Sequence, residues 1–172
     1  MMSETRFDTV TLRKIFRKAD MRGKTALVLS TWFGAGLVPR APGTCGALAG
    51  LPLVLITRCF SPLYEALFLF AFVLLAIWSS ERSYRLLGRE DPSEVVIDEV
   101  AGYLLALFLL PSSWLTVSLG FLLFRIFDIW KPFPIKKIEV VKGGPGIVLD
   151  DLAAGLYANL IVRGMLLLLR YT

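Results

Sequence analysis

Long apolar stretches alternate with short polar segments over most of the chain. Residues 41–57 and 66–80 carry no charge, and residues 152–169 contain a single charged side chain. Residues 100–124 are a run of 25 uncharged residues, which Pro111 divides. A run of this length exceeds the roughly 20 residues of one membrane span, so it predicts a hairpin of two helices.

This pattern predicts an all-α fold, an integral membrane helical bundle of four or five spans. We expect spans at residues 41–58, 63–80, 96–110, 114–130 and 150–169. Residues 26–38 are apolar but short and contain Gly34 and Gly36, so a re-entrant or interfacial Gly/Pro-rich segment is expected there. Irregular backbone at membrane depth is tolerated only where other protein covers it.

The first 25 residues differ from the rest of the chain. They hold seven basic side chains against three acidic ones, and Leu12, Ile15 and Phe16 fall on one helical face. Residues 1–25 are therefore predicted to be a basic amphipathic arm, and residues 26–172 a membrane-embedded domain. Such an arm can lie along an anionic membrane surface. The alternative is a solvated basic arm that only sets the orientation of the protein in the membrane.

Basic residues gather in alternate connections between the predicted spans. The arm, residues 81–94 and residues 131–142 are rich in Lys and Arg, whereas the turns near Arg58 and Pro111 are not. Because cytoplasmic loops of membrane proteins carry the excess of Lys and Arg, the basic connections are expected in the cytoplasm. The predicted location is the cell inner (cytoplasmic) membrane, with several spans and the active site facing the cytoplasm.

Composition supports the membrane interpretation. Of the 172 residues, 56% are hydrophobic and 19% charged, and the mean hydropathy is +0.67. Soluble domains carry about 45–50% apolar and about 25% charged residues. The net charge of +5 fits basic cytoplasmic loops, so no nucleic-acid partner is expected. The chain has no histidine, which excludes mechanisms that need an imidazole base, nucleophile or metal ligand.

Five acids fall at ends of predicted spans that share one side of the membrane. They are Asp98, Glu99, Asp128, Asp150 and Asp151. An acid beside an apolar helix is unfavourable unless it is paired, hydrated or bound to metal. Five acids at one level of the bundle therefore predict a shared cation.

Each acid also has a structural explanation. Asp150 or Asp151 can be the N-cap of the last helix, and Asp98 and Glu99 can be acids in the first turn of another. Asp128 can form an ion pair with Arg125, three residues earlier.

Metal-assisted phosphoryl transfer suits this set of residues. Carboxylates hold Mg²⁺, the metal neutralises charge on the phosphate, and Arg or Lys binds the phosphate oxygens. One or two Mg²⁺ ions are compatible with five acids. The candidate substrate-binding residues are Arg40, Thr44, Arg125, Lys131 and Lys142.

Four motifs in succession resemble those of the phosphatidylglycerophosphatase A family. They are Leu37–Thr44, Val96–Gly102, Phe124–Ile135 and Gly143–Asp151. The resemblance implies a Mg²⁺-dependent membrane enzyme of phospholipid biosynthesis that hydrolyses phosphatidylglycerol phosphate to phosphatidylglycerol and inorganic phosphate. It also implies catalytic and metal-binding roles for the five acids. A small membrane transporter or channel with an acidic cation site is the alternative, and the oligomeric state stays open.

Overall fold

The computed structural model describes residues 9–89, 92–138 and 141–171, and all regular structure in these ranges is helical. The helices are α1 (Thr9–Lys18), α2 (Met21–Ser30), the 3₁₀ helix η1 (Ala35–Leu37), α3 (Pro42–Ala49), α4 (Leu51–Thr57), α5 (Pro62–Leu87), α6 (Ile97–Leu107), α7 (Trp114–Trp130), α8 (Ile135–Ile138) and α9 (Gly144–Tyr171). The all-α prediction is confirmed for these residues. The predicted hairpin is also present, since residues 108–113 join α6 to α7.

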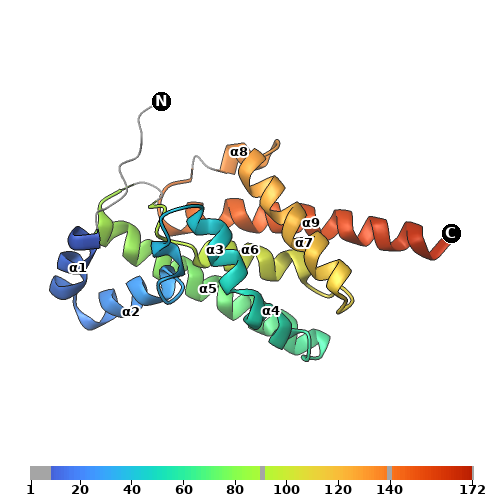
Figure 1. The fold of residues 1–172 in the computed structure, drawn as a ribbon, viewed down its shortest axis with the longest axis horizontal. Helices are drawn as coiled ribbons and strands as arrows, with labels where there is room; N and C mark the ends of the chain where they lie inside the picture. Colours follow the sequence, from blue (N-terminus) through green and yellow to red (C-terminus); the bar gives the residue numbers. More distant parts are fainter. Residues whose placement is uncertain (1–8, 90–91, 139–140, 172) are drawn as a thin grey trace.

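Helix α6 lies at the centre of the bundle. It packs most extensively against α9 and also contacts α5, α7 and α3 (Figure 1). Nine of its residues are buried, because its sequence is apolar on all sides after the first turn. A helix that is apolar all round is stable only when other helices surround it. The bundle therefore holds the two acids of the first α6 turn inside the structure.

Within the described residues, two helices are long and apolar enough to cross a membrane, Pro62–Leu87 and Gly144–Leu169. The other predicted spans correspond to shorter elements. Helices α3 and α4 meet at Gly50, α7 has 17 residues, and α6 has only 11. At 1.5 Å per residue, α6 is roughly half as long as the ~30 Å hydrocarbon layer. The number of four or five spans stays a prediction. Two of the predicted spans correspond to helices that are long enough to cross a membrane.

Polar side chains donate hydrogen bonds to the backbone carbonyls at the carboxyl end of α6, which have no partner within the helix. Asn159 Nδ2 donates to the carbonyls of Leu105, Ala106 and Phe108, at 2.9–3.2 Å. Arg163 donates to Asn159 Oδ1 and to Phe108 O. Arg58 donates to the carbonyls of residues 107 and 110. Unsatisfied carbonyls are unfavourable in apolar surroundings, so these side chains allow a short helix to end inside the bundle.

We expect Asn159→Leu to destabilise the protein by about 1–3 kcal/mol, because the carbonyls of Leu105 and Ala106 lose their side-chain donor and Phe108 O retains only that of Arg163. The measurement is thermal unfolding of the detergent-purified protein, with Leu160→Ala as the control. Leu160 is 56% exposed, so its truncation should leave the unfolding temperature nearly unchanged. Equal stability of Asn159→Leu and the wild type would contradict this capping role.

The amino-terminal helices are fixed to the end of α5. Ser30 Oγ lies 2.7 Å from Ser83 Oγ, and Arg82 pairs with Asp20 at 3.1 Å. Asp20 also caps α2 by accepting from the Gly23 N–H. The Gly23 hydrogen bond, followed by that of Arg82, holds the pKa of Asp20 below its usual value.

The predicted boundary of the arm after residue 25 falls inside α2, which runs unbroken from Met21 to Ser30. The segment predicted as re-entrant or interfacial comprises the end of α2, a turn and η1. Trp32, Phe33 and Gly34 have positive φ in this turn. The position of this segment relative to a membrane stays a prediction. The part of the predicted arm before Thr9 lies outside the described ranges.

Candidate active site

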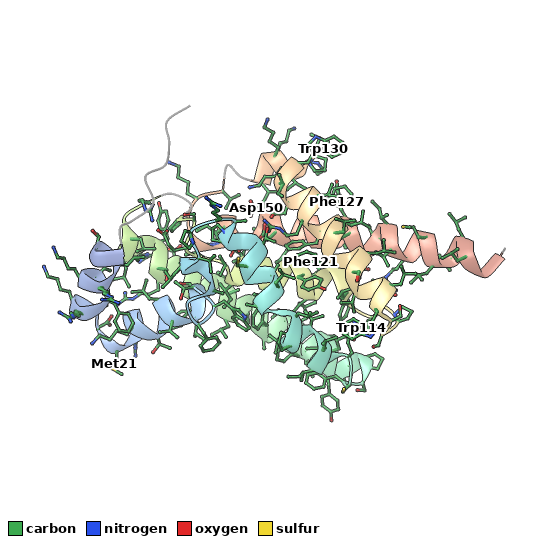
Figure 2. The ribbon with its side chains drawn as sticks, in the orientation of Figure 1. Met21, Trp114, Phe121, Phe127, Trp130 and Asp150 are labelled. Atoms are coloured by element: carbon green, nitrogen blue, oxygen red, sulfur yellow. The ribbon has the colours of Figure 1, made fainter. Side chains whose placement is uncertain are left out.

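Three helices bring the five predicted acids together. Asp98 and Glu99 lie in the first turn of α6, and Asp128 lies in the last turn of α7. Asp150 and Asp151 lie in the second turn of α9, and Figure 2 shows Asp150 near the middle of the molecule. The charges of the other four acids all act on Asp151. Residues that are up to 53 positions apart in the sequence therefore form one acidic cluster.

Three of these acids have the arrangement of a metal site. Asp98, Glu99 and Asp151 each offer a carboxylate oxygen, and these oxygens lie within 4.8 Å of one another. We call these residues the acid trio. Asp98 and Asp151 are buried, and Glu99 Oε2 is a buried oxygen without a hydrogen-bond partner among the described residues. Buried carboxylates this close repel one another, which favours binding of a cation between them.

The other two acids form ion pairs at the edge of the trio. Arg125 Nη1 lies 2.5 Å from Asp128 Oδ2, and Lys131 Nζ lies 2.6 Å from Asp150 Oδ2. When all five acids are ionised, these two cations leave an excess of three negative charges. The cluster therefore combines a carboxylate site for a cation with an Arg and a Lys beside it.

Close packing of α6 against α9 sets the spacing within the trio. A Cβ added to Gly155 would overlap the carbonyl of Gly102, and one added to Gly102 would lie 2.7 Å from the carbonyl of Asp151. Each glycine lies four residues after an acid of the trio, on the same helical face. Small residues let helix backbones approach closely, and here the acids lie one turn from the point of closest approach.

The first turn of α3 lies against one side of the cluster. Gly43, in the first turn of α3, is buried against Glu99 and Arg125. Ala41 reaches the start of this helix through a left-handed conformation, with φ of 50°. A Cβ at position 43 would overlap Glu99 Oε1, so a side chain here would displace the Glu99 carboxylate. The signal in the sequence was the Pro-Gly pair at the start of an apolar helix, but it did not identify Gly43 as the contact.

The sequence profile of one family, Phosphatidylglycerophosphatase A, matches residues 28–166. The chain belongs to this family. Membership confirms the family that the motifs suggested, and it confirms the predicted enzyme class, a lipid phosphatase. The acid trio and both ion pairs lie within the matched residues of this phosphatidylglycerophosphatase A family member.

Curated relatives are similar over most of the chain. A Phosphatidylglycerophosphatase A of Escherichia coli (strain K12) is 37% identical over 131 residues, covering 74% of this chain and 76% of the relative. A Phosphatidylglycerophosphatase A of Haemophilus influenzae is 37% identical over 138 residues, covering 78% of this chain and 85% of the relative. A "Putative phosphatidylinositol-3-phosphatase" of Bacteroides thetaiotaomicron is 36% identical over 145 residues, covering 79% of this chain and 90% of the relative. No solved structure gave a significant match.

The predicted substrate-binding residues lie at different places in this family member. Arg125 and Lys131 adjoin the acidic cluster through their ion pairs. Thr44 is half-buried in the first turn of α3, next to Gly43, and Arg40 is exposed in the loop before it. Lys142 is exposed and lines a separate cavity with Glu81 and Arg85.

The structural explanations for the acids have different outcomes. The N-cap explanation for Asp150 and Asp151 is wrong, because α9 begins at Gly144 and both acids lie in its second turn. Asp98 and Glu99 do lie in the first turn of α6, where a carboxylate complements the helix dipole. The Arg125–Asp128 ion pair is present. A position in the first helical turn and an ion pair are both compatible with a metal or catalytic site. The catalytic and metal-binding roles of the five acids therefore stay predictions.

We expect Gly43→Ala to reduce phosphatase activity strongly, by about 10²-fold, because the new Cβ would displace Glu99 and crowd Arg125. The backbone of Gly43 is helical, so alanine introduces no conformational strain of its own. Gly164→Ala is the matched control, because a Cβ there meets nothing within 4 Å. The comparison requires folded proteins, checked by thermal unfolding, and equal activity of the two variants would contradict a role for the Gly43 contact.

Proposed function

We propose that this protein hydrolyses the phosphate monoester of phosphatidylglycerol phosphate to give phosphatidylglycerol and inorganic phosphate, a step of phospholipid biosynthesis. The observation that carries the proposal is the acid trio flanked by Arg125 and Lys131. Two relatives named Phosphatidylglycerophosphatase A, each 37% identical, support this substrate.

The acid trio fits Mg²⁺ by the chemistry of its donors. Mg²⁺ prefers hard oxygen ligands, and the three carboxylates supply them from two rigid helices. Asp98, Glu99 and Asp151 would hold the ion, and when bound it would neutralise charge on the phosphate and help to activate water. The net negative charge of the cluster supports the same assignment.

The chain's own residues would bind the phosphate and accept a proton. Arg125 presents a planar guanidinium suited to two phosphate oxygens, and Asp128 holds it in position. Lys131 would provide a second positive charge, which Asp150 holds near the cluster. A water molecule that attacks phosphorus must lose a proton. Because the chain lacks histidine, the carboxylates of the acidic cluster are the available bases.

A membrane setting supports a lipid substrate. Exposed large apolar side chains cover the outer faces of α5, α7 and α9, as expected for helices that face lipid. Trp114 and Trp130 lie at the two ends of α7, and both are more than 70% exposed (Figure 2). Tryptophan at both ends of an apolar helix is typical of the two membrane interfaces.

The orientation follows from the basic residues at one end of α5. Arg82, Arg85 and Arg89 lie in or just after the last turns of that helix. We place this end on the cytoplasmic side of the inner membrane, where the active site would meet the phosphate of a lipid headgroup.

The decisive experiment is phosphate release by the full-length protein in detergent micelles with Mg²⁺. We expect hydrolysis of phosphatidylglycerol phosphate to exceed that of phosphatidylinositol 3-phosphate at equal surface concentration. Phosphatidylinositol 3-phosphate is the appropriate competitor because the relative from Bacteroides thetaiotaomicron is named a putative phosphatidylinositol-3-phosphatase. Phosphatidic acid tests whether the glycerol headgroup matters. Faster hydrolysis of either competitor would overturn the assigned substrate, and no hydrolysis of any of the three would overturn the proposed function.

A further inference from the structure

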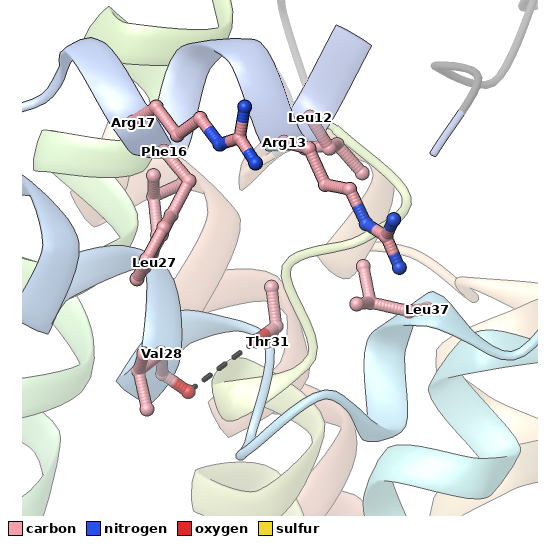
Figure 3. Close-up of a pocket in the computed structure, with 8 residues that line it drawn as sticks. All are labelled: Leu12, Arg13, Phe16, Arg17, Leu27, Val28, Thr31 and Leu37. Atoms are coloured by element: carbon pink, nitrogen blue, oxygen red, sulfur yellow. Dashed lines mark hydrogen bonds between the residues drawn. The ribbon is translucent and has the colours of Figure 1, made fainter. Parts of the chain in front are cut away.

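We propose that a cleft between α1, α2 and η1 binds one anionic phospholipid of the surrounding membrane, at a place separate from the acidic cluster. The cleft has a volume of about 470 Å³, within the range of roughly 300–1,000 Å³ that is usual for ligand sites. Its lining residues are Leu12, Arg13, Phe16, Arg17, Leu27, Val28, Thr31 and Leu37 (Figure 3).

The wall of the cleft suits a hydrocarbon chain. Five of its eight lining residues are large and apolar, and they come from α1, α2 and η1. The hydroxyl of Thr31 is already engaged, since it donates to the carbonyl of Val28 at 3.3 Å and accepts from the Gly34 N–H at 3.2 Å. No other uncharged polar side chain lines the cleft. An acyl chain would therefore bury apolar surface without stranding a polar group.

Two arginines at the rim suit a phosphate group. Arg13 and Arg17 are one helical turn apart on α1, and Figure 3 shows both guanidinium groups extending over the space between the elements. No carboxylate of the described residues lies within ion-pair distance of either one. Two neighbouring guanidinium groups can bind one phosphate by charge-assisted hydrogen bonds. The combination of apolar wall and cationic rim matches an anionic amphiphile.

The cleft is held at one end of a candidate membrane span. The Arg82–Asp20 ion pair and the Ser30–Ser83 contact fix α2 to the last turns of α5. Anionic headgroups concentrate basic segments at the cytoplasmic surface, where we place this end of α5. The family profile begins at residue 28, so α1 and most of α2 lie outside the matched region. We therefore assign the site to this chain's own amino-terminal helices.

The test uses a phosphatidylglycerol analogue with a photoreactive acyl chain, added to the full-length protein in neutral detergent micelles. We expect labelling of the peptides that contain residues 12–37, and competition by unlabelled phosphatidylglycerol but not by phosphatidylcholine or inorganic phosphate. Arg13→Gln/Arg17→Gln should reduce this labelling by about tenfold. Lys14→Gln/Lys18→Gln is the matched control, because it removes the same charge from exposed positions of α1 outside the cleft.

Three outcomes would overturn the proposal. Equal labelling by a phosphatidylcholine analogue would show an unselective apolar surface. Equal loss in both double variants would show general attraction of anionic lipid to a basic helix. A dimer in light scattering that only Arg13→Gln/Arg17→Gln disrupts would assign the cleft to a second copy of the chain. Phosphatase activity of the variants is measured in parallel, and its retention separates loss of this site from loss of the enzyme.

Discussion

Asp151→Asn is expected to reduce phosphate release on the order of 10³-fold or more, whereas Asp150→Asn should reduce it by about 10–100-fold. Asp151 belongs to the acid trio and is 4% exposed. Asparagine has the same size, but it lacks the charge that a cation requires. Asp150 pairs with Lys131 instead, so its replacement should mainly misplace that lysine. The two neighbouring acids therefore have different expected effects.

The measurement is kcat and KM for phosphatidylglycerol phosphate with Mg²⁺. Asp20→Asn is the control, because Asp20 is exposed between α1 and α2 and is far along the chain from the trio. If folded Asp151→Asn and Asp98→Asn proteins both keep near-normal rates, the trio is not the catalytic centre. A larger loss for Asp150→Asn than for Asp151→Asn would contradict the division of roles between them.

Removal of divalent cations should abolish activity and also lower the unfolding temperature of the wild type. Without a cation, the carboxylates of the trio repel one another inside the bundle. Binding restores stability by mass action, by about 2.7 kcal/mol when Mg²⁺ is present at 100 times its dissociation constant. In chelator, Asp151→Asn should therefore unfold at the same temperature as the wild type or at a higher one, despite its expected loss of activity.

Thermal unfolding in detergent, with chelator or with Mg²⁺, measures this effect without relying on activity. The wild type and Asp20→Asn should both be stabilised by Mg²⁺, and Asp151→Asn should show little or no stabilisation. Activity that persists in chelator would exclude a required cation. A Mg²⁺ effect of equal size in all three proteins would show that the ion binds elsewhere.

Local sequence pattern was sufficient to identify the long helices. Apolar runs interrupted by Pro and Gly correspond to α5, α7 and α9, and Pro111 lies in the turn between α6 and α7. Positions of helix ends were less predictable. The last helix was expected from residue 150 but begins at Gly144, because Gly-Pro-Gly at its start is compatible with either a turn or a first helical turn.

Tertiary contacts also decided features of α6 that its composition leaves open. Its 11 residues are too few to cross a bilayer alone. Asn159 and Arg163, more than 50 residues later, donate to the carbonyls that its early end exposes. A sequence pattern reports which residues prefer apolar surroundings, but it does not report which distant donor will satisfy a backbone group.

The sequence by itself determined the helical class, the five acids and the motifs that carry the family resemblance, since these depend on local composition and spacing. Only the tertiary structure separated the acid trio from the ion-paired Asp128 and Asp150. It also placed Lys142 in another cavity and Gly43 against Glu99. Adjacent residues such as Asp150 and Asp151 have nearly the same sequence context, but they point about 100° apart on a helix. Their partners are therefore set by the packing of α6, α7 and α9.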